Sequence, residues 1–390
     1  EVLSAVPLAT QAIPPTFEQA ATTLAGASRE GRTVRIHGAG TKLGWGAPTA
    51  AADLELWTTG LNRIVEHNVG DLTAILEAGV PLAEAQRTFA AAGQMLALDP
   101  PLAISHDCPS GATIGGVAAT GDSGPLRHRY GAPRDLIVGA TVALSDGSIA
   151  KSGGKVIKNV AGYDLAKLFA GSFGTLGVIL SVSVRLHPLH RETTTVLSAA
   201  DDPELLGATA IAMSASQVEF EALDVAWRGG RGGVLGRCSG REHARRARRA
   251  GRALAELGLG QVDVTDEGDA LWERQRAGQR SDERALVQVA APPSELPAVL
   301  RAVDACDGTL VGRAALGLSY VEIEPETVAK FRAGLPMARR TTVLDAPPSL
   351  LAELDPWGTL ESPALELMRS VKARFDPTRT CNPGLFVGGI

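Results

Sequence analysis

Glycine is concentrated in a few stretches of the first half of the chain, and the first stretch constrains the fold most. It reads RIHGAGTKLGWG over residues 35–46, with four glycines in twelve residues directly after the strand-like run TVRIH. Glycine lets a backbone turn sharply and bring its N–H groups close to a bound group, most often a phosphate. From this stretch alone, a plain glycine-rich hairpin remains the alternative.

Two common phosphate loops do not fit this stretch. A Rossmann loop needs G-x-G-x-x-G opening a helix, but Leu43 stands where the third glycine belongs. Gly46 and Pro48 then interrupt the place where the helix would run. A nucleoside triphosphate loop needs Gly-Lys-Ser/Thr, whereas Lys42 follows a threonine and precedes a leucine. The loop is therefore predicted to join one strand to another.

Composition and charge exclude several classes of function. A net charge of −5 over 390 residues argues against nucleic acid as the main partner. The arginine-rich run at 241–257 has its arginines at helical spacing opposite alanines, which favours a solvated helix face over a docking patch. The four scattered cysteines lack CxxC spacing, so we expect no disulfide framework, zinc site or iron–sulfur cluster.

The sequence also bears on location. No apolar stretch approaches the roughly 18–20 residues that a membrane span needs. The amino terminus, EVLSAVPLATQAIPP, lacks the basic start of a signal peptide. We therefore expect a cytoplasmic protein, with peripheral attachment to the membrane through partner subunits as the alternative.

Local patterns predict short strands with few helices in the first part of the chain. Helices are expected over 16–30 and 81–92, the second with a proline at its start. Strands are expected over 33–37, 53–57, 63–66 and 72–78. The segment RYGAPRDLIVGATVALSDGS alternates apolar residues and is predicted to be a hairpin closed by Asp146-Gly147.

The second and third glycine stretches suggest a surface against which a large ligand can lie. Residues 109–124 read PSGATIGGVAATGDSG, and residues 171–179 read GSFGTLGVI, a turn that feeds an apolar strand. Both are interpreted as loops whose surface carries almost no protruding side chains. Backbone N–H groups and the hydroxyls of Ser110, Thr113, Thr120 and Ser123 would serve as donors to a bulky anionic cofactor.

Taken together, these motifs resemble a known family. The succession RIHGAGTKL, GATIGGVAATGDSGPLRHRYGAPRDLIVGATVALSDG, KNVAGYDLAKLFAGSFGTLGVI and FDPTRTCNPGLF is similar to the FAD-binding domain shared by vanillyl-alcohol oxidase and p-cresol methylhydroxylase (PCMH). Within that superfamily the chain is most similar to glycolate oxidase FAD-binding subunits, the smaller flavin subunits of three-subunit glycolate dehydrogenases. GQMLALDPP, GGKVIKNVAGYDL and the ending APP…WG…KARFDP…NPG support this narrower match.

The resemblance implies a fold and a division into domains. The expected class is α+β, with a two-subdomain PCMH-type FAD-binding domain over 1–190, its subdomains at about 1–100 and 101–190. An α+β cap for substrate or interface contacts is expected over 191–345. The segment 346–390 is expected to return to the FAD-binding domain.

The resemblance also implies cofactor contacts. The pyrophosphate of FAD would be held by backbone groups of the first loop, and the flavin with its ribityl-phosphate arm by the second glycine stretch. Gly177 and Ile179 would meet the adenine or the pyrimidine side of the flavin, and Asn382 would return from the far terminus to the ring. The implied set is Gly38, Ala39, Gly40, Thr41, Lys42, Pro109, Ser110, Gly111, Ala112, Thr113, Gly115, Gly116, Ala119, Thr120, Gly121, Asp122, Ser123, Gly177, Ile179 and Asn382.

FAD is expected to be bound without a covalent tether. Relatives with a histidyl-FAD carry that histidine in the first glycine loop, where this chain has Ala39 and Thr41. Cys108 lies near the place of a cysteinyl attachment, but its spacing to the glycine pair is one residue too long. Phe173 and the sequence Ala-Thr-Gly-Asp-Ser-Gly depart from the common family pattern without removing backbone donors.

No single catalytic side chain is predicted. Oxidation of a 2-hydroxy acid needs a cation for the carboxylate, and Arg313, Arg339 and Arg340 are candidates by position. It also needs a base for the hydroxyl proton, and only His106 and His128 flank the flavin motifs. Each histidine has a plain structural role as its alternative. The cap contains one histidine, His243, so the metal-binding histidine pattern of catalytic flavin subunits is missing, and no metal is expected.

Three hypotheses about function follow. In the first, the chain is an FAD-dependent oxidoreductase subunit acting on CH–OH groups within a glycolate dehydrogenase complex. A sister flavin subunit would then oxidise the 2-hydroxy acid, and an iron–sulfur subunit would accept the electrons. In the second, it is a self-sufficient FAD-dependent hydroxy acid or alcohol dehydrogenase with a pocket under the cap. In the third, it is a flavin-binding scaffold without redox turnover. The histidine-poor cap favours the first hypothesis over the second.

Overall fold

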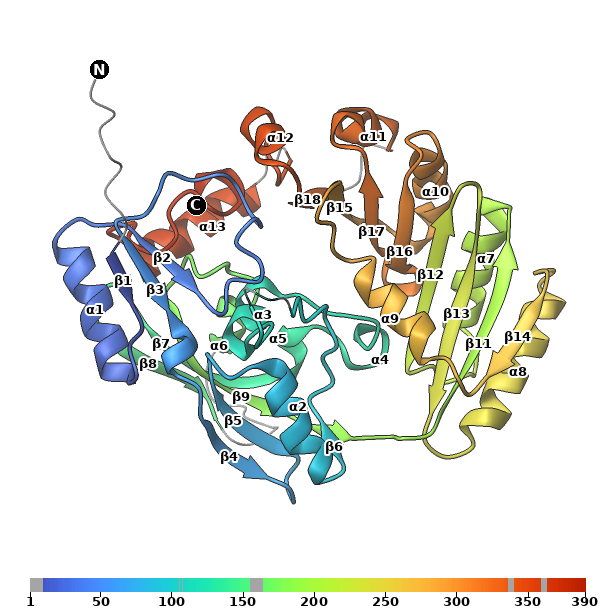
Figure 1. Ribbon diagram of the computed structural model, residues 1–390, viewed down its shortest axis with the longest axis horizontal. Helices are drawn as coiled ribbons and strands as arrows, with labels where there is room; N and C mark the ends of the chain where they lie inside the picture. The colour runs from blue at the N-terminus through green and yellow to red at the C-terminus, as the bar shows by residue number, and fades with distance from the viewer. Residues whose placement is uncertain (1–9, 105, 107, 155–163, 336–339, 359–362) are drawn as a thin grey trace.

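The computed structural model describes residues 10–104, 106, 108–154, 164–335, 340–358 and 363–390. These residues form two lobes that stand side by side in Figure 1. The amino-terminal lobe carries a three-stranded and a five-stranded sheet, and the cap lobe is built around an eight-stranded sheet. Most of the motif KNVAGYDL lies outside the described residues.

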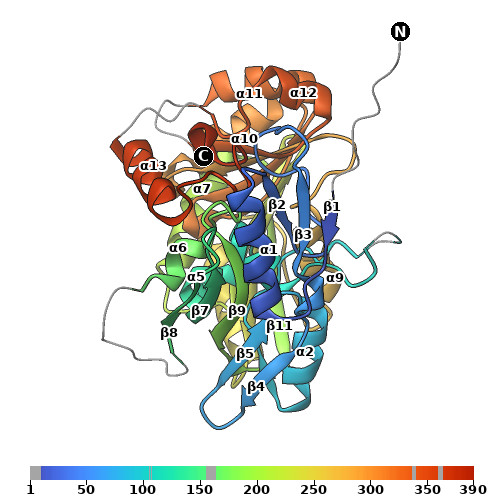
Figure 2. The same ribbon diagram turned by 90° about the vertical axis from the view of Figure 1, so that its left-hand side faces the viewer.

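The first sheet of the amino-terminal lobe is parallel and has the order β1-β3-β2. Its strands are β1 (Thr10–Ala12), β2 (Val34–His37) and β3 (Leu54–Trp57). Helix α1 (Phe17–Arg29) begins where the Thr16 hydroxyl accepts a hydrogen bond from the backbone N–H of Gln19, at 3.2 Å. It buries Leu24 against Leu56 and the next sheet, and Figure 2 shows it lying across these strands. The predicted first helix and first strands are confirmed.

The second sheet is antiparallel and has the order β4-β5-β9-β7-β8. Its strands are β4 (Ile64–Asn68), β5 (Thr73–Glu77), β7 (Ile137–Ala143), β8 (Ile149–Gly153) and β9 (Val178–Arg185). The predicted hairpin is confirmed, because β7 pairs with β8 around a turn in which Gly147 has a φ of +87°. Helix α2 (Leu82–Ala91) begins after Pro81 as expected and packs with this sheet.

The second glycine stretch differs from its prediction. Residues Ile114–Thr120 form helix α3, whereas the sequence predicts a loop. Thr113 caps the helix by accepting from the Gly116 N–H, and Gly121 ends it in the left-handed conformation at a φ of +68°. Gly115 is required by packing, since a Cβ there would lie 2.6 Å from the Cβ of Ala78. Tertiary packing thus stabilises a helix that the low helix propensity of glycine disfavours.

The cap lobe is one antiparallel sheet with the order β14-β11-β13-β12-β16-β17-β15-β18. Its strands are β11 (Thr193–Ala200), β12 (Ala222–Arg228), β13 (Arg231–Ser239), β14 (Val262–Thr265), β15 (Ala285–Ala290), β16 (Thr309–Arg313), β17 (Leu318–Ile323) and β18 (Arg340–Asp345). One face is covered by α7 (Pro203–Ser214), α8 (His243–Glu256), α10 (Leu296–Asp304) and α11 (Val328–Gly334). The buried residues of α8 are Ala247, Ala250, Gly251 and Leu254, so its arginines form the predicted outward face.

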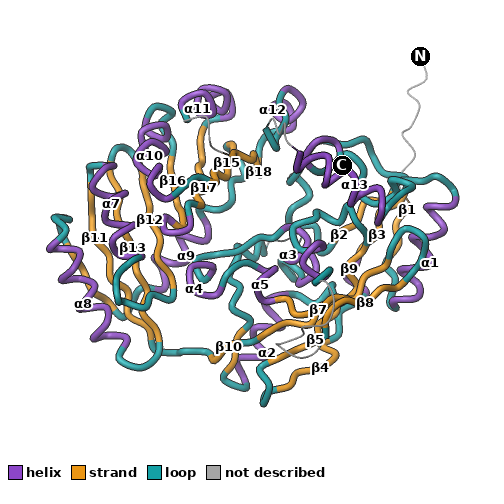
Figure 3. The backbone as a smooth tube through the Cα atoms, turned by 180° about the vertical axis from the view of Figure 1, so that it is seen from behind, coloured by secondary structure: helices purple, strands orange, loops and turns teal. Residues whose placement is uncertain are grey.

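The two lobes are joined in three ways. Strand β10 (His187–Pro188) precedes the connection into the cap, as Figure 3 shows from behind, and it pairs with β6 (Gln94–Met95). Helices α4 (Arg127–Tyr130) and α9 (Asp269–Ala277) lie between the lobes in Figure 1. After α12 (Pro348–Glu353), helix α13 (Pro363–Phe375) returns the chain to the amino-terminal lobe, as expected.

No helix in the described ranges is long and apolar enough to cross a membrane.

Candidate cofactor site

The three glycine stretches meet around one open cavity of the amino-terminal lobe. The empty space of this cavity, open solvent included, is about 820 Å³. Its lining combines the loop after β2, the start of α3, the turn before β9 and the returning carboxyl-terminal segment. Thirteen of the residues predicted to bind the cofactor line it: Gly38, Ala39, Gly40, Thr41, Lys42, Thr113, Gly115, Gly116, Ala119, Thr120, Gly177, Ile179 and Asn382.

Seven predicted residues lie outside this lining. They are Pro109, Ser110, Gly111, Ala112, Gly121, Asp122 and Ser123. Ala112 and Ser123 are buried in the protein interior, so their side chains serve packing and internal hydrogen bonds. Backbone contacts of this group with FAD stay a prediction.

The lining also includes residues that the sequence analysis missed: Arg35, Ile36, His37, Leu43, Trp45, Thr58, Ala78, Phe173, Gly174 and Leu385. Arg35 to His37 belong to β2 and could have been found as neighbours of the first loop. Trp45 belongs to the same stretch of sequence, whereas Ala78 and Leu385 could not have been found, because only the folded chain brings them to the cavity.

The first loop has the geometry of an anion cradle. Gly40 has a φ of +81°, a conformation that side chains with a Cβ rarely adopt. Within the described residues, the backbone N–H groups of Ala39, Thr41 and Lys42 donate no hydrogen bond to a protein acceptor. A Cβ on Gly38 would collide with the hydroxyl of Thr113. The absence of a side chain at position 38 therefore lets the loop pack closely against α3. The loop joins β2 to β3 without a helix, as predicted.

The start of α3 contributes differently. Its Ile114 N–H donates to the carbonyl of Val80 at 2.9 Å, and its Gly115 N–H donates to Ala78 at 2.7 Å. These groups, which usually bind anions at a helix start, are already satisfied by the strand-to-helix segment after β5. The unpaired donors therefore come from the first loop, and α3 supplies a flat surface of small residues.

Asn382 links three parts of the chain. Its side-chain oxygen accepts from the Ile36 N–H at 2.8 Å, and its side-chain nitrogen donates to the Phe173 carbonyl at 2.6 Å. Its own N–H donates to Val34 at 2.9 Å. Asn382 thus lines the cavity as expected, while its amide is engaged by protein groups and positions the surrounding loops.

A buried ion pair stands beside the cavity. The Nζ of Lys42 lies 3.1 Å from a carboxylate oxygen of Asp122, and the two side chains are only 6% and 2% exposed. Lys42 also lies over the Trp45 ring, 5.5 Å from its centroid. Pairing lets both charges stay buried. Lys42 lines the cavity, and its charge is balanced there by the Asp122 carboxylate.

At the other end of the loop, His37 is buried between Glu55 and Trp57. Its Nε2 contacts the Glu55 carboxylate, and its ring stacks on Trp57 with centroids 4.5 Å apart. Burial lowers the pKa of His37, although hydrogen bonding to Glu55 opposes the shift. Burial lowers the pKa of the neighbouring Arg35, and the Glu55 carboxylate opposes this shift. Arg35 lines the cavity, where its guanidinium offers a cation to a phosphate.

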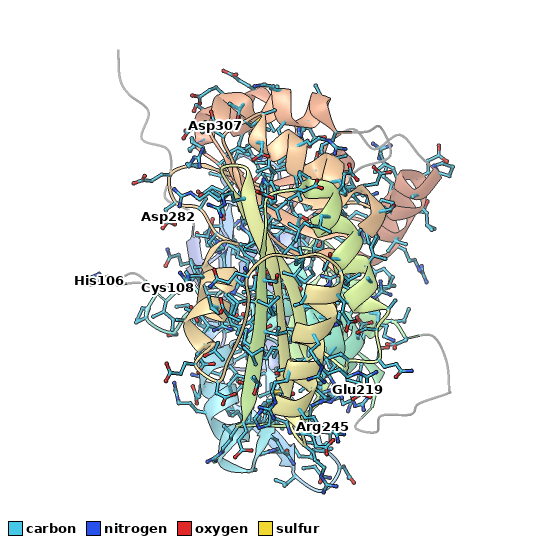
Figure 4. The ribbon with its side chains drawn as sticks, turned by 90° about the vertical axis from the view of Figure 1, so that its right-hand side faces the viewer. His106, Cys108, Glu219, Arg245, Asp282 and Asp307 are labelled. Atoms are coloured by element: carbon cyan, nitrogen blue, oxygen red, sulfur yellow. The ribbon has the colours of Figure 1, made fainter. Side chains whose placement is uncertain are left out.

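The candidate bases lie away from the cavity lining. His106 is exposed at the rim of the molecule beside Cys108, as Figure 4 shows, far from Glu219 and Arg245 on the cap. The Cys108 thiol donates to the Ala39 carbonyl at 3.2 Å, next to the first loop. His128 is half-buried on α4, and burial lowers its pKa. A catalytic role for either histidine stays a prediction.

The candidate carboxylate clamps are likewise apart from the cavity lining. Arg313 is fully buried in the cap sheet beside Asp224, with 3.7 Å between Nε and the carboxylate oxygen. Arg340 begins β18, and Arg339 lies outside the described residues.

Comparison with known proteins agrees with this geometry. Residues 9–153 match the FAD binding domain family. The segment includes the first loop, α3 and the β7–β8 hairpin, which surround or support the cavity. Residues 9–153 thus carry an FAD binding domain, and FAD is the cofactor of this chain.

The curated relatives include glycolate oxidase subunits and D-lactate dehydrogenases. The chain is 35% identical over 156 residues to the glycolate oxidase subunit GlcE of Escherichia coli (40% of this chain, 43% of that protein). It is 36% identical over 162 residues to the glycolate oxidase subunit GlcD of Bacillus subtilis (41% and 33%). It is 33% identical over 154 residues to the mitochondrial D-lactate dehydrogenase [cytochrome] of Arabidopsis thaliana (40% and 25%). The matched segment spans less than half of each relative.

The whole fold is similar to that of solved structures. A structure of alkyldihydroxyacetonephosphate synthase superposes with a TM-score of 0.66 at 14% identity, covering 96% of this chain and 76% of the other. This likeness concerns the fold alone. It extends through the cap and the carboxyl-terminal segment, and the expected fold class is confirmed.

Proposed function

We propose that this chain is an FAD-dependent oxidoreductase subunit of the glycolate oxidase and D-lactate dehydrogenase group, acting in the oxidation of a 2-hydroxy acid. The observation that carries the proposal is the cavity itself. It gathers residues from the first loop, α3, the turn before β9 and Asn382, and its first loop offers unpaired backbone donors. The sequence similarity to GlcE and GlcD supports the substrate class.

When bound, FAD supplies a two-electron acceptor for the carbon–hydrogen bond of the substrate. The residues of this chain would bind and orient it. Backbone N–H groups of Ala39, Thr41 and Lys42 would donate to the pyrophosphate, and Arg35 would offset its negative charge. Gly116, which has no side chain and lines the cavity, would let the cofactor lie close to the backbone of α3.

We further propose that the chain works within a complex, in which a sister flavin subunit oxidises glycolate and an iron–sulfur subunit accepts the electrons. The cap histidine supports this assignment. Nδ1 of His243 lies 2.8 Å from the Thr194 hydroxyl, and its Nε2 lies 3.6 Å from Glu192. Both ring nitrogens thus meet groups at or just before the start of β11. His243 lines a second cavity, together with Met95 and Asp99 of the amino-terminal lobe, and does not line the cofactor cavity.

The alternative is a self-sufficient dehydrogenase with a pocket under the cap. It is favoured by one observation, the polar residues of the cap sheet that are buried next to the amino-terminal lobe. The side-chain amide of Gln279 donates to the Ser123 carbonyl at 2.9 Å, and the guanidinium of Arg313 donates to Gln279. A substrate carboxylate could use Arg313 if the lobes separated.

Anaerobic flavin reduction distinguishes the two proposals. The purified chain is loaded with FAD, and glycolate or D-lactate is added with and without the sister and iron–sulfur subunits. We expect the flavin absorbance of this chain to bleach only when the partners are present. Bleaching of the isolated chain would contradict the complex-dependent proposal and support the alternative. A chain that retains no FAD would contradict both.

A further inference from the structure

Arg280 connects the cap lobe to the first glycine loop. It follows α9, and its Nη1 donates to the Thr41 carbonyl at 3.0 Å. Its Nε and Nη2 donate to the two carboxylate oxygens of Asp345 at 3.0 and 3.3 Å. One guanidinium therefore contacts a cap strand end and the backbone of the cofactor loop at the same time.

Asp345 and Trp45 complete this contact from both lobes. Asp345 ends β18, and its Oδ1 also accepts from the indole N–H of Trp45 at 2.8 Å. Trp45 belongs to the first loop, is 4% exposed, and lies under the Arg280 guanidinium at 5.5 Å. The same indole packs against Leu318 and Leu344 of the cap. We call Trp45, Arg280 and Asp345 the loop–cap latch.

The latch acts on the donor geometry of the cofactor loop. A peptide unit is planar and trans, so its C=O and N–H point in opposite directions. Because Arg280 holds the Thr41 carbonyl toward the cap, the N–H of Lys42 in the same peptide is aimed the other way. Lys42 lines the cavity, and its N–H has no acceptor among the described residues.

We infer that Arg280 is a positioning residue of the FAD site, and that the loop–cap latch couples FAD binding to docking of the cap. The inference rests on the FAD binding of the proposed function and adds a cap residue to it. Coupling between two binding events is reciprocal. Cap docking thus prepares the loop for the pyrophosphate, and bound FAD in turn holds the cap in place.

The test compares R280Q and R280K with R284Q. Arg284 is a matched control, because it lies in the same cap segment with a side chain 24% exposed against 22% for Arg280. Its ion-pair partners, Glu322 and Glu324, both belong to the cap. FAD is titrated into each apoprotein and the Kd is measured by flavin fluorescence. Hydrogen exchange of β18 is measured with and without FAD.

R280Q is expected to weaken FAD binding by about tenfold or more, since it removes a charge-assisted donor to the loop. R280K is expected to weaken FAD binding by a similar factor. Its ammonium can pair with Asp345, but it lacks the several N–H donors of a guanidinium that bind Asp345 and the Thr41 carbonyl at the same time. R284Q is expected to change the Kd by less than about twofold. FAD should slow hydrogen exchange of β18 in the wild type and in R284Q, and much less in R280Q.

Equal FAD affinity of R280K and wild type would overturn the inference, as would an equal loss in R280Q and R284Q. R280K keeps a cation beside Asp345, so it remains informative if R280Q fails to fold. A wild-type chain that binds no FAD would overturn the proposed function and the coupling together. A wild-type chain that binds FAD no more tightly than R280K overturns the coupling alone.

Discussion

At the scale of single residues, the cofactor loop depends on positions that have no side chain. Gly40 has a φ of +81°, and a Cβ there would lie 3.3 Å from the Trp57 ring. Gly44 belongs to the same loop, yet its φ is ordinary and a Cβ would meet nothing within 4 Å. Substitutions at these two glycines therefore distinguish a requirement of the cofactor site from a general effect of adding a side chain to the loop.

We predict that G40V abolishes FAD retention while G44V retains it. Valine at position 40 disfavours the required positive φ and presses on Trp57, so the loop cannot keep its donors together. The measurement is the ratio of flavin to protein absorbance after purification. Full flavin content in G40V would mean that the pyrophosphate is bound elsewhere.

At the scale of elements, a buried lysine helps to attach α13 to the amino-terminal lobe, beside the packing of Phe375 on Phe169. Lys372 is 6% exposed, and its Nζ contacts the Thr175 carbonyl at 2.6 Å, Asp376 at 2.7 Å and the Cys381 carbonyl at 2.8 Å. Asp376 in turn accepts from the Cys381 N–H at 2.8 Å. This cluster precedes Asn382 and fixes the segment that reaches the cavity.

We predict that K372M lowers the free energy of unfolding by about 3 kcal/mol, because it leaves the Asp376 carboxylate buried without its cation. The matched control is K167M, since Lys167 pairs with Asp164 at 3.0 Å on an exposed surface. That pair should contribute less than about 1 kcal/mol. Urea denaturation measures both variants. Equal effects would show that the buried cluster does not anchor α13.

At the scale of the whole molecule, buried charges lie where the cap faces the amino-terminal lobe. Asp224 is fully buried beside Arg313, and it also lies in the field of Asp99 and Arg237. Arg276 is 3.7 Å from Asp99 across the lobes. Burial raises the pKa of Asp224 to about 7 and that of Asp99 to about 6, against the opposing effect of the arginines.

The direction of the pH dependence follows from these shifts. Both carboxyl groups have an ordinary pKa of 3.8 and hold their protons to higher pH when folded. The folded state therefore binds more protons than the unfolded state between about pH 4 and 7, and their contribution to stability falls as pH rises through that window. We predict that D224N, whose amide does not titrate, shows a flatter decline of Tm than the wild type.

Thermal unfolding from about pH 4.5 to 8 measures this difference, and the slopes rather than the absolute Tm values are compared. Absolute stability will also change, because the substitution leaves Arg313 with one charge partner fewer. Parallel curves for the two proteins would contradict the assignment of the raised pKa to Asp224.

Most of the site can be predicted from the sequence where it depends on residues that are neighbours along the chain. The strand-to-strand character of the first loop follows from a missing third glycine and from Pro48. The prediction fails where packing between residues far apart in the sequence decides the backbone conformation. Helix α3 is not predicted, because Gly115 and Gly116 disfavour a helix in isolation. Contact with Ala78 and the Thr113 cap stabilise this helix in the folded chain.

Glycine loops suited to FAD, a single histidine in the cap and an α+β order of elements can all be recognised from the amino-acid sequence. These properties depend on neighbouring residues, through positive φ, missing side chains and apolar periodicity. How the site is held depends instead on tertiary packing. Arg280 meets Thr41, and Asn382 meets Ile36 and Phe173, across hundreds of residues of sequence. No local pattern encodes such pairs, since each requires two lobes or two chain ends to pack first.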